Sequence, residues 1–161
     1  MKLKRLLGVL ALGLAVVILA ACGQKSTENV IKNELKDSYT GYSNDRSYDG
    51  NIFKEGSDTL AFDKKENTIT NSEGYKVYFS VVPEDERSST TKSVLKTLDS
   101  SLSDTDNFTI VISSKVKNPT VDDSAAFYQI ALSDGGKTIK IYELRRNSRD
   151  YGYYEFSGES A

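Results

Sequence analysis

From residue 59 onward, apolar side chains recur at every second position in short runs, and this spacing predicts β-strands. The clearest run follows Gly74 and covers residues 75–82. Gly135 and Gly136 supply the positive φ that a tight hairpin between two later runs requires. Seven strands are predicted in all, over residues 59–63, 67–70, 75–82, 108–112, 125–132, 138–144 and 151–156.

Two other segments show the spacing of a helix. In the stretch TENVIKNELKDS, Val30, Ile31 and Leu35 fall near one helical face. Thr27 is the predicted N-cap of this helix, and Gly41 lies beyond its end. The second helix has one apolar face and a capping residue between positions 88 and 91; the face consists of Val94, Leu95, Leu98 and Leu102.

The order of these elements is one helix, three strands, a second helix and four strands, which contains no βαβ rhythm. All connections between strands are short enough for antiparallel pairing. We therefore expect one α+β domain over residues 29–157, with a tail at 158–161. It is built on a curved antiparallel sheet of about six to seven strands with two short helices. A barrel-like closure of the sheet is one alternative, and its pattern is loosely similar to calycin-type extracellular domains.

The N-terminal pattern differs in kind from the rest of the chain. A basic head containing Lys2, Lys4 and Arg5 precedes an uncharged apolar run from Leu6 to Ala21. Basic residues followed by an apolar run and small residues are typical of a targeting segment. The run has 16 residues, fewer than the roughly 17–25 that a helix needs to cross a bilayer. We therefore expect residues 1–21 to be a signal peptide that is cleaved.

The apolar run ends in Leu19, Ala20, Ala21 and Cys22, and this tetrapeptide resembles the lipobox of bacterial lipoproteins. The resemblance implies that the Cys22 thiol receives a diacylglyceryl group and that cleavage before Cys22 makes it the new N-terminus. Two acyl chains hold a protein stably on a membrane, whereas one does not. The resemblance thus predicts anchoring to the outer face of the cytoplasmic membrane, with residues 22–28 as a lipidated tether. The alternative is a buried free cysteine at the end of an uncleaved helix.

Composition excludes several classes of chemistry. The chain has no histidine, which removes the commonest general base and every Ser-His or Cys-His nucleophile. Without residues 1–21, 18 basic residues face 23 acidic ones, so a nucleic-acid partner, which needs a concentrated basic face, is not expected. The loop carboxylates Asp45 and Asp49, or Asp104 and Asp106, lack EF-hand spacing. We expect no enzyme activity, no cofactor and no metal.

The candidate binding patch lies near the C-terminus, in the stretch ELRRNSRDYGYYEF. Arginine and tyrosine are enriched together in recognition hot spots. The patch consists of Arg145, Arg146, Arg149, Tyr151, Tyr153 and Tyr154. In the alternative interpretation, Tyr151 and Tyr153 share one strand face and Tyr154 and Phe156 share the other, one of these two rows completes the core, and the arginines solvate the turn.

These features favour a membrane-anchored binding or accessory module that recognises a protein or a glycan. One alternative is a carrier of a small apolar ligand, which requires a cavity inside the sheet lined by residues such as Phe79, Ile110 and Phe127. Another is an immunity or surface-exclusion lipoprotein. Whether the interior of the sheet is hollow or filled separates the carrier from surface recognition.

Overall fold

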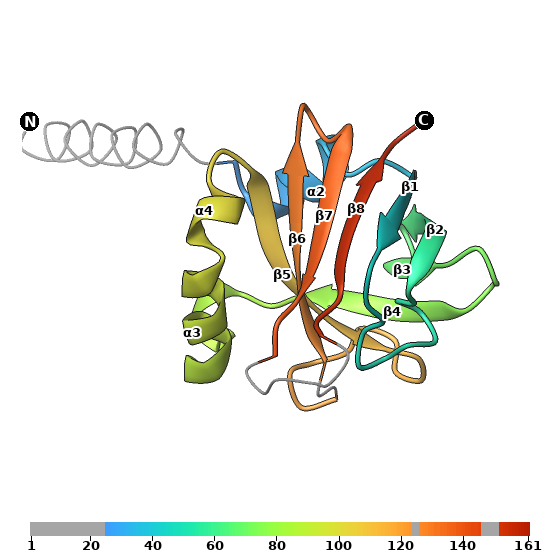
Figure 1. Cartoon of the computed structure of the whole chain (residues 1–161). Helices are drawn as coiled ribbons and strands as arrows, with labels where there is room; N and C mark the ends of the chain where they lie inside the picture. The colour runs from blue at the N-terminus through green and yellow to red at the C-terminus, as the bar shows by residue number, and fades with distance from the viewer. Residues whose placement is uncertain (1–24, 124–125, 146–151) are drawn as a thin grey trace, which may run out of the picture.

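The computed structural model describes residues 25–123, 126–145 and 152–161. Within this part of the chain, eight strands form a closed barrel with short helices beside it (Figure 1). The helices are α2 (Thr27–Asn33), the 3-10 helix η1 (Glu84–Glu86), α3 (Ser89–Thr97) and α4 (Asp99–Leu102). The strands are β1 (Ser38–Ser43), β2 (Gly56–Asp63), β3 (Thr68–Thr70), β4 (Lys76–Val81), β5 (Asp106–Ser113), β6 (Phe127–Ser133), β7 (Thr138–Glu143) and β8 (Glu155–Glu159).

Each strand pairs antiparallel with the next strand in the chain, and β8 returns to pair with β1. The barrel-like alternative is therefore confirmed, but the predicted count of six to seven strands is wrong. The missed strand is β1, whose inward positions are Tyr39, Gly41 and Ser43. Only the first of these is a large apolar residue, so the usual alternation is invisible in the sequence.

The ends of the predicted domain also shift. β8 begins four residues later than the predicted strand 151–156 and continues to Glu159, so half of the predicted tail, Gly158 and Glu159, pairs with β1 and β7. At the other end, α2 begins at Thr27, inside the predicted tether. Its N-cap is Ser26 rather than Thr27, because the Ser26 hydroxyl accepts a hydrogen bond from the Asn29 amide at 3.2 Å.

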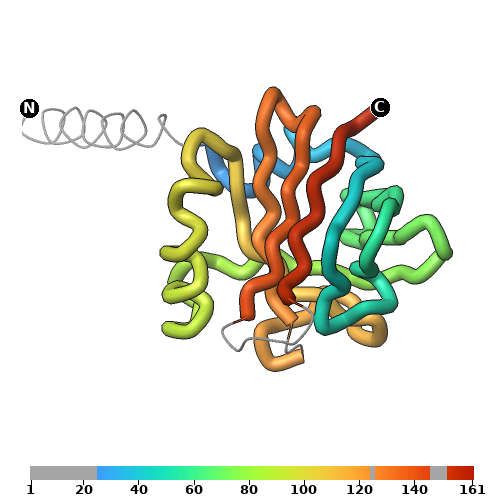
Figure 2. The backbone as a smooth tube through the Cα atoms, in the orientation of Figure 1, coloured from blue at the N-terminus to red at the C-terminus, as the bar shows by residue number. Residues whose placement is uncertain are grey.

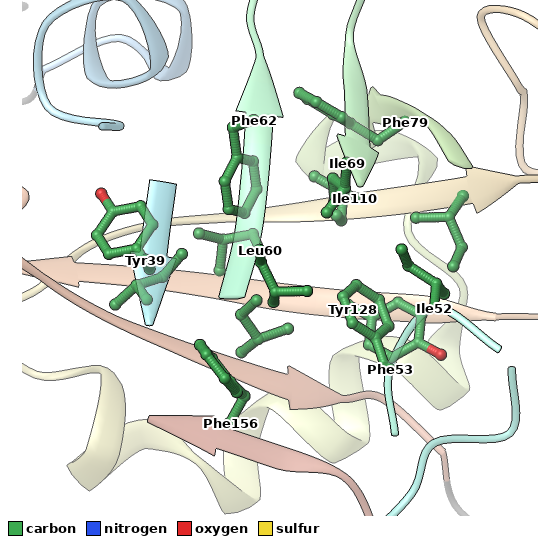
Figure 3. Close-up of a cluster of buried hydrophobic side chains, with 14 of the residues drawn as sticks. Tyr39, Ile52, Phe53, Leu60, Phe62, Ile69, Phe79, Ile110, Tyr128 and Phe156 are labelled. Atoms are coloured by element: carbon green, nitrogen blue, oxygen red, sulfur yellow. The ribbon is translucent and has the colours of Figure 1, made fainter. Parts of the chain in front are cut away.

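The interior of the barrel is filled with apolar side chains from all eight strands. Phe62, Ile69 and Phe79 lie toward one end of the close-up in Figure 3, and Phe53 and Tyr128 lie toward the other. Phe53 stands edge-on to Tyr128, with ring centroids 4.6 Å apart, and Tyr39 stands edge-on to Phe62 at 5.9 Å. Such contacts add to the free energy gained by burial. The sheet therefore encloses a packed core.

Each end of the barrel is closed by a segment of the chain. At one end, here called the helix end, Val30 of α2 and Leu35, which follows the helix, lie in the core. At the other, here called the loop end, the loop after β1 contributes Ile52 and Phe53, and both are fully buried. In an antiparallel meander alternate connections share an end, so the loops after β1, β3, β5 and β7 all lie at the loop end.

Polar contacts hold α2 against the helix end. The Lys25 ammonium lies 3.1 Å from Glu34 and 2.9 Å from Asp106 at the start of β5. The Tyr39 hydroxyl accepts a hydrogen bond from the Lys36 amide and donates one to the Gly136 carbonyl at 2.7 Å. Burial raises the pKa of the Tyr39 hydroxyl. These contacts join α2 to β1, β5 and the β6–β7 hairpin.

The helices α3 and α4 lie outside the barrel, beside β5 (Figure 2). Ser88 caps α3, as the sequence predicts, by accepting a hydrogen bond from the Thr91 amide. Thr109 and Gln129, on the outer side of β5 and β6, are fully buried and share a 2.6 Å hydrogen bond. This pair satisfies polar groups that would otherwise be costly to bury.

Closure of the barrel depends on two glycines. Gly41 of β1 and Gly158 of β8 are direct cross-strand partners, and the Phe156 ring packs against both. A Cβ atom at position 41 would lie 2.1 Å from the Ser157 carbonyl oxygen and 2.7 Å from Cζ of Phe156. No side chain fits there unless β1 and β8 separate.

We predict that Gly41→Ala lowers the free energy of unfolding by about 1–3 kcal/mol, because the added methyl group overpacks the β1–β8 pair. Gly50→Ala is the matched control, since its Cβ would meet no atom closer than 3.6 Å. Urea denaturation of both variants measures the difference. Equal stabilities would contradict the role given to the glycine pair.

Candidate functional site

Several of the predicted site residues lie outside the described residues. These are Leu19, Ala20, Ala21 and Cys22 of the lipobox, and Arg146, Arg149 and Tyr151 of the binding patch. Lipidation of Cys22 therefore stays a prediction. The described part of the patch consists of Arg145, Tyr153 and Tyr154.

Tyr154 belongs to the core and not to the surface patch. Its side chain is 2% exposed. Its ring stacks on Phe53 with centroids 5.1 Å apart and on Phe156 with centroids 6.3 Å apart. Burial raises the pKa of its hydroxyl. The alternative interpretation, in which one of the two rows completes the core, therefore holds for the row of Tyr154 and Phe156.

Arg145 follows β7 and stacks on a tyrosine that the sequence did not single out. Its guanidinium carbon lies 4.1 Å from the centroid of the Tyr48 ring, in the geometry of a cation–π contact. The Tyr48 ring is 58% exposed although it is a large apolar group. The Tyr48–Arg145 pair thus presents, at the loop end, the two residue types that dominate binding hot spots.

A buried carboxylate positions this pair. Glu143, the last residue of β7, is only 5% exposed. Its two oxygens accept hydrogen bonds from the amides of Tyr48 at 2.9 Å and Tyr154 at 3.2 Å. One carboxylate therefore ties the loop after β1 to the loop after β7, and charge-assisted bonds of this kind are stronger than neutral ones.

The loop after β1 has its own internal hydrogen bonds. The Ser47 hydroxyl donates to the Asp49 carbonyl at 2.8 Å, and the Ser47 amide donates to the Phe53 carbonyl at 2.9 Å. Together with the buried Ile52 and Phe53, these bonds make the loop a fixed platform. The backbone of Tyr48 is held, while its ring faces solvent.

An open groove of about 340 Å³ lies beside this end of the barrel, on the outer face of β1 and β8. We call it the tyrosine groove. It is lined by Tyr42, Asn44, Asp45, Tyr153, Glu155 and Ser157. Two residues of the predicted patch therefore lie in different places: Tyr153 lines the tyrosine groove, and Arg145 belongs to the Tyr48–Arg145 pair.

A second hollow, of about 790 Å³, lies at the helix end between α2 and the turn after β2. Ile31, Val81, Lys32 and Lys65 are among the residues that line it.

The residues predicted to line the cavity of a carrier do not surround a common space. Phe79 and Ile110 are packed in the core, and Phe127 is a partly exposed residue outside it.

Comparison with protein families, curated proteins and solved structures finds no match to this chain. Among the described residues, no helix is both long and apolar enough to span a bilayer. The same residues contain no group of three or more acidic or cysteine side chains placed to hold a metal ion. Function must therefore be argued from the site alone.

We predict that Glu143→Gln lowers the free energy of unfolding by about 1–3 kcal/mol, because the amide cannot accept both backbone hydrogen bonds as a carboxylate does. Denaturation measures this loss, and hydrogen exchange at the Tyr48 and Tyr154 amides locates it. Glu55→Gln, at an exposed position in the same loop, is the control. Unchanged exchange at both amides in Glu143→Gln would show that the carboxylate does not hold the loops.

Proposed function

We propose that this protein is a lipid-anchored binding module that recognises a protein or a glycan with the loop end of its barrel. One observation carries the proposal: the barrel interior is packed, while the exposed Tyr48, with the partly buried Arg145 stacked on its ring, is fixed on a rigid platform at the loop end. Binding residues are commonly carried on loops that a rigid scaffold positions.

The packed interior argues against the carrier alternative. A small apolar ligand inside the barrel would need the space that Tyr39, Tyr128 and Phe156 occupy, and all three side chains are fully buried. Ligand sites are usually preformed hollows of several hundred cubic ångströms. The hollows described above open on the outer surface, so recognition outside the barrel fits this chain better.

The proposed anchor gives the barrel an orientation. Cys22 precedes Lys25 by three residues, and three residues span at most about 11 Å when fully extended. Lys25 is held at the helix end by Glu34 and Asp106. An acylated Cys22 would therefore keep the helix end close to the membrane, and the loop end would face away from it toward a partner.

The folded α2 also limits the reach of the domain. An unravelled segment of roughly 15 residues could extend to about 50 Å. Unravelling would expose Val30 and Leu35, which the core buries, and burying an aliphatic side chain is worth about 1.5–3 kcal/mol. The burial of Val30 and Leu35 therefore supports a domain that stays close to the membrane surface.

The anchor is tested by metabolic labelling with a palmitate analogue. We expect the wild-type chain to carry the label and to fractionate with membranes, and Cys22→Ala to lose both, since Cys22 is the only thiol. Ser26→Ala, close in sequence but outside the lipobox, should keep both. Label and fractionation that survive in Cys22→Ala would overturn the anchor.

Recognition is tested with a fluorescent chain of residues 23–161 and envelopes from the source bacterium with its own gene deleted. We expect Tyr48→Ala and Arg145→Ala each to weaken binding about tenfold, which corresponds to about 1.4 kcal/mol. Arg87→Ala, in a separate hollow that also contains Lys25 at the helix end, should bind as wild type does. The reverse pattern would place recognition at the other end and refute the proposal.

A further inference from the structure

The tyrosine groove combines aromatic rings with negative charge, and this combination is independent of the Tyr48–Arg145 pair. Of its six lining residues, Tyr42 and Tyr153 are aromatic, and Asp45 and Glu155 carry carboxylates. Ser157 and Asn44 add uncharged polar groups, and none of these six described lining residues is basic. A hollow of this composition attracts cations and repels anions.

The face of the Tyr42 ring is left open by its neighbours. Tyr42 points outward from β1, and its cross-strand partners are Ser57 on β2 and Ser157 on β8. A serine is too short to cover an aromatic ring, so the Tyr42 side chain is 51% exposed. The negative face of an aromatic ring attracts a cation that lies over it.

The carboxylates are held on two sides of the groove. Asp45 lies against the backbone at Gly152, where a Cβ atom would come within 2.7 Å of Asp45 Oδ1. Gly152 also has a φ of +81°, which favours glycine. Glu155 stands on β8, and its carboxylate lies 3.6 Å from the Lys140 ammonium. Such an exposed ion pair is weak, so a ligand cation can compete with Lys140 for Glu155.

We propose that the tyrosine groove binds an alkylammonium group carried by the partner of this protein. The inference deepens the proposed function, since it names the chemistry that one part of the loop end recognises. Aromatic rings beside carboxylates are suited to an ammonium group because both attract its positive charge. The attraction to a ring needs no N–H donor, so a quaternary ammonium group can bind as well. A neutral sugar gains hydroxyl hydrogen bonds from the two carboxylates, whereas an ammonium group also gains from their charge and from the faces of the rings.

The test is an NMR titration of the mature lipidated chain in a maltoside detergent, which contributes no ammonium groups. The probes are choline, ethanolamine and 3,3-dimethylbutanol, a neutral isostere of choline. We expect one or both cations to shift the Tyr42 and Tyr153 signals, and the neutral isostere to bind at least about fivefold more weakly. A preference for choline indicates a quaternary source, and a preference for ethanolamine indicates a primary amine; both results support the groove.

Variants separate the groove from the rest of the surface. Tyr42→Ala and Asp45→Asn should each weaken cation binding about threefold to tenfold, whereas Lys140→Ala should strengthen it by freeing Glu155. Tyr75→Ala is the matched control, because Tyr75 is also 51% exposed but lies outside the groove. No cation binding, equal binding of the neutral isostere, or loss in Tyr75→Ala alone would overturn the inference. If envelope binding still depended on Tyr48 and Arg145, the proposed function would survive that failure.

Discussion

The close approach of β1 and β8 at Gly41 and Gly158 is the constraint on which the rest of the molecule depends. An open eight-stranded sheet would leave two edges able to pair with other chains, and closure removes both. At this seam the Phe156 ring fills the space that side chains at the two glycines would occupy. The same ring stacks on Tyr154, so the seam is continuous with the aromatic core.

A barrel closed around a packed core acts as a scaffold. The side chains that could touch a partner must lie outside it, and their positions are set from within. Glu143 shows how this works: its carboxylate is buried at the end of β7, yet it fixes the backbone of the exposed Tyr48. Because the carboxylate also holds the Tyr154 amide, the exposed Tyr48 and the core stack share one support.

The sequence predicts strands well where large apolar residues alternate, as in β5, β6 and β7. It fails at β1, because the inward positions Gly41 and Ser43 are small. The reason is not local: Gly41 must be small to admit Phe156, which lies more than a hundred residues later in the chain. The local spacing of apolar residues cannot reveal a contact with a residue so far away in the chain.

The candidate site was likewise only partly predictable from the sequence. Arginine and tyrosine enrichment near the C-terminus selected Arg145 and Tyr153, which lie at or near the surface, but it also included Tyr154, whose ring completes the core. Period-two spacing places Tyr154 and Phe156 on one face, and only the packed structure shows that this face points inward. The partners Tyr42 and Tyr48 come from the other end of the chain. They reach the patch through the β1–β8 register and through Glu143, which no local pattern encodes.

The N-terminal helix α2 has two structural roles: it closes one end of the barrel, and it connects the barrel to the N-terminal segment. As a lid, α2 supplies Val30 to the core and leads into the buried Leu35, and unravelling this segment would expose both residues. As a connector, it fixes Lys25 beside Glu34 and Asp106, three residues from the proposed lipid. A flexible tether would let the barrel tumble above the membrane and present all of its faces equally. If Cys22 carries the proposed lipid, a tether that ends in a packed lid restricts that motion, and the loop end, with the exposed Tyr48 and the partly buried Arg145, is turned away from the membrane.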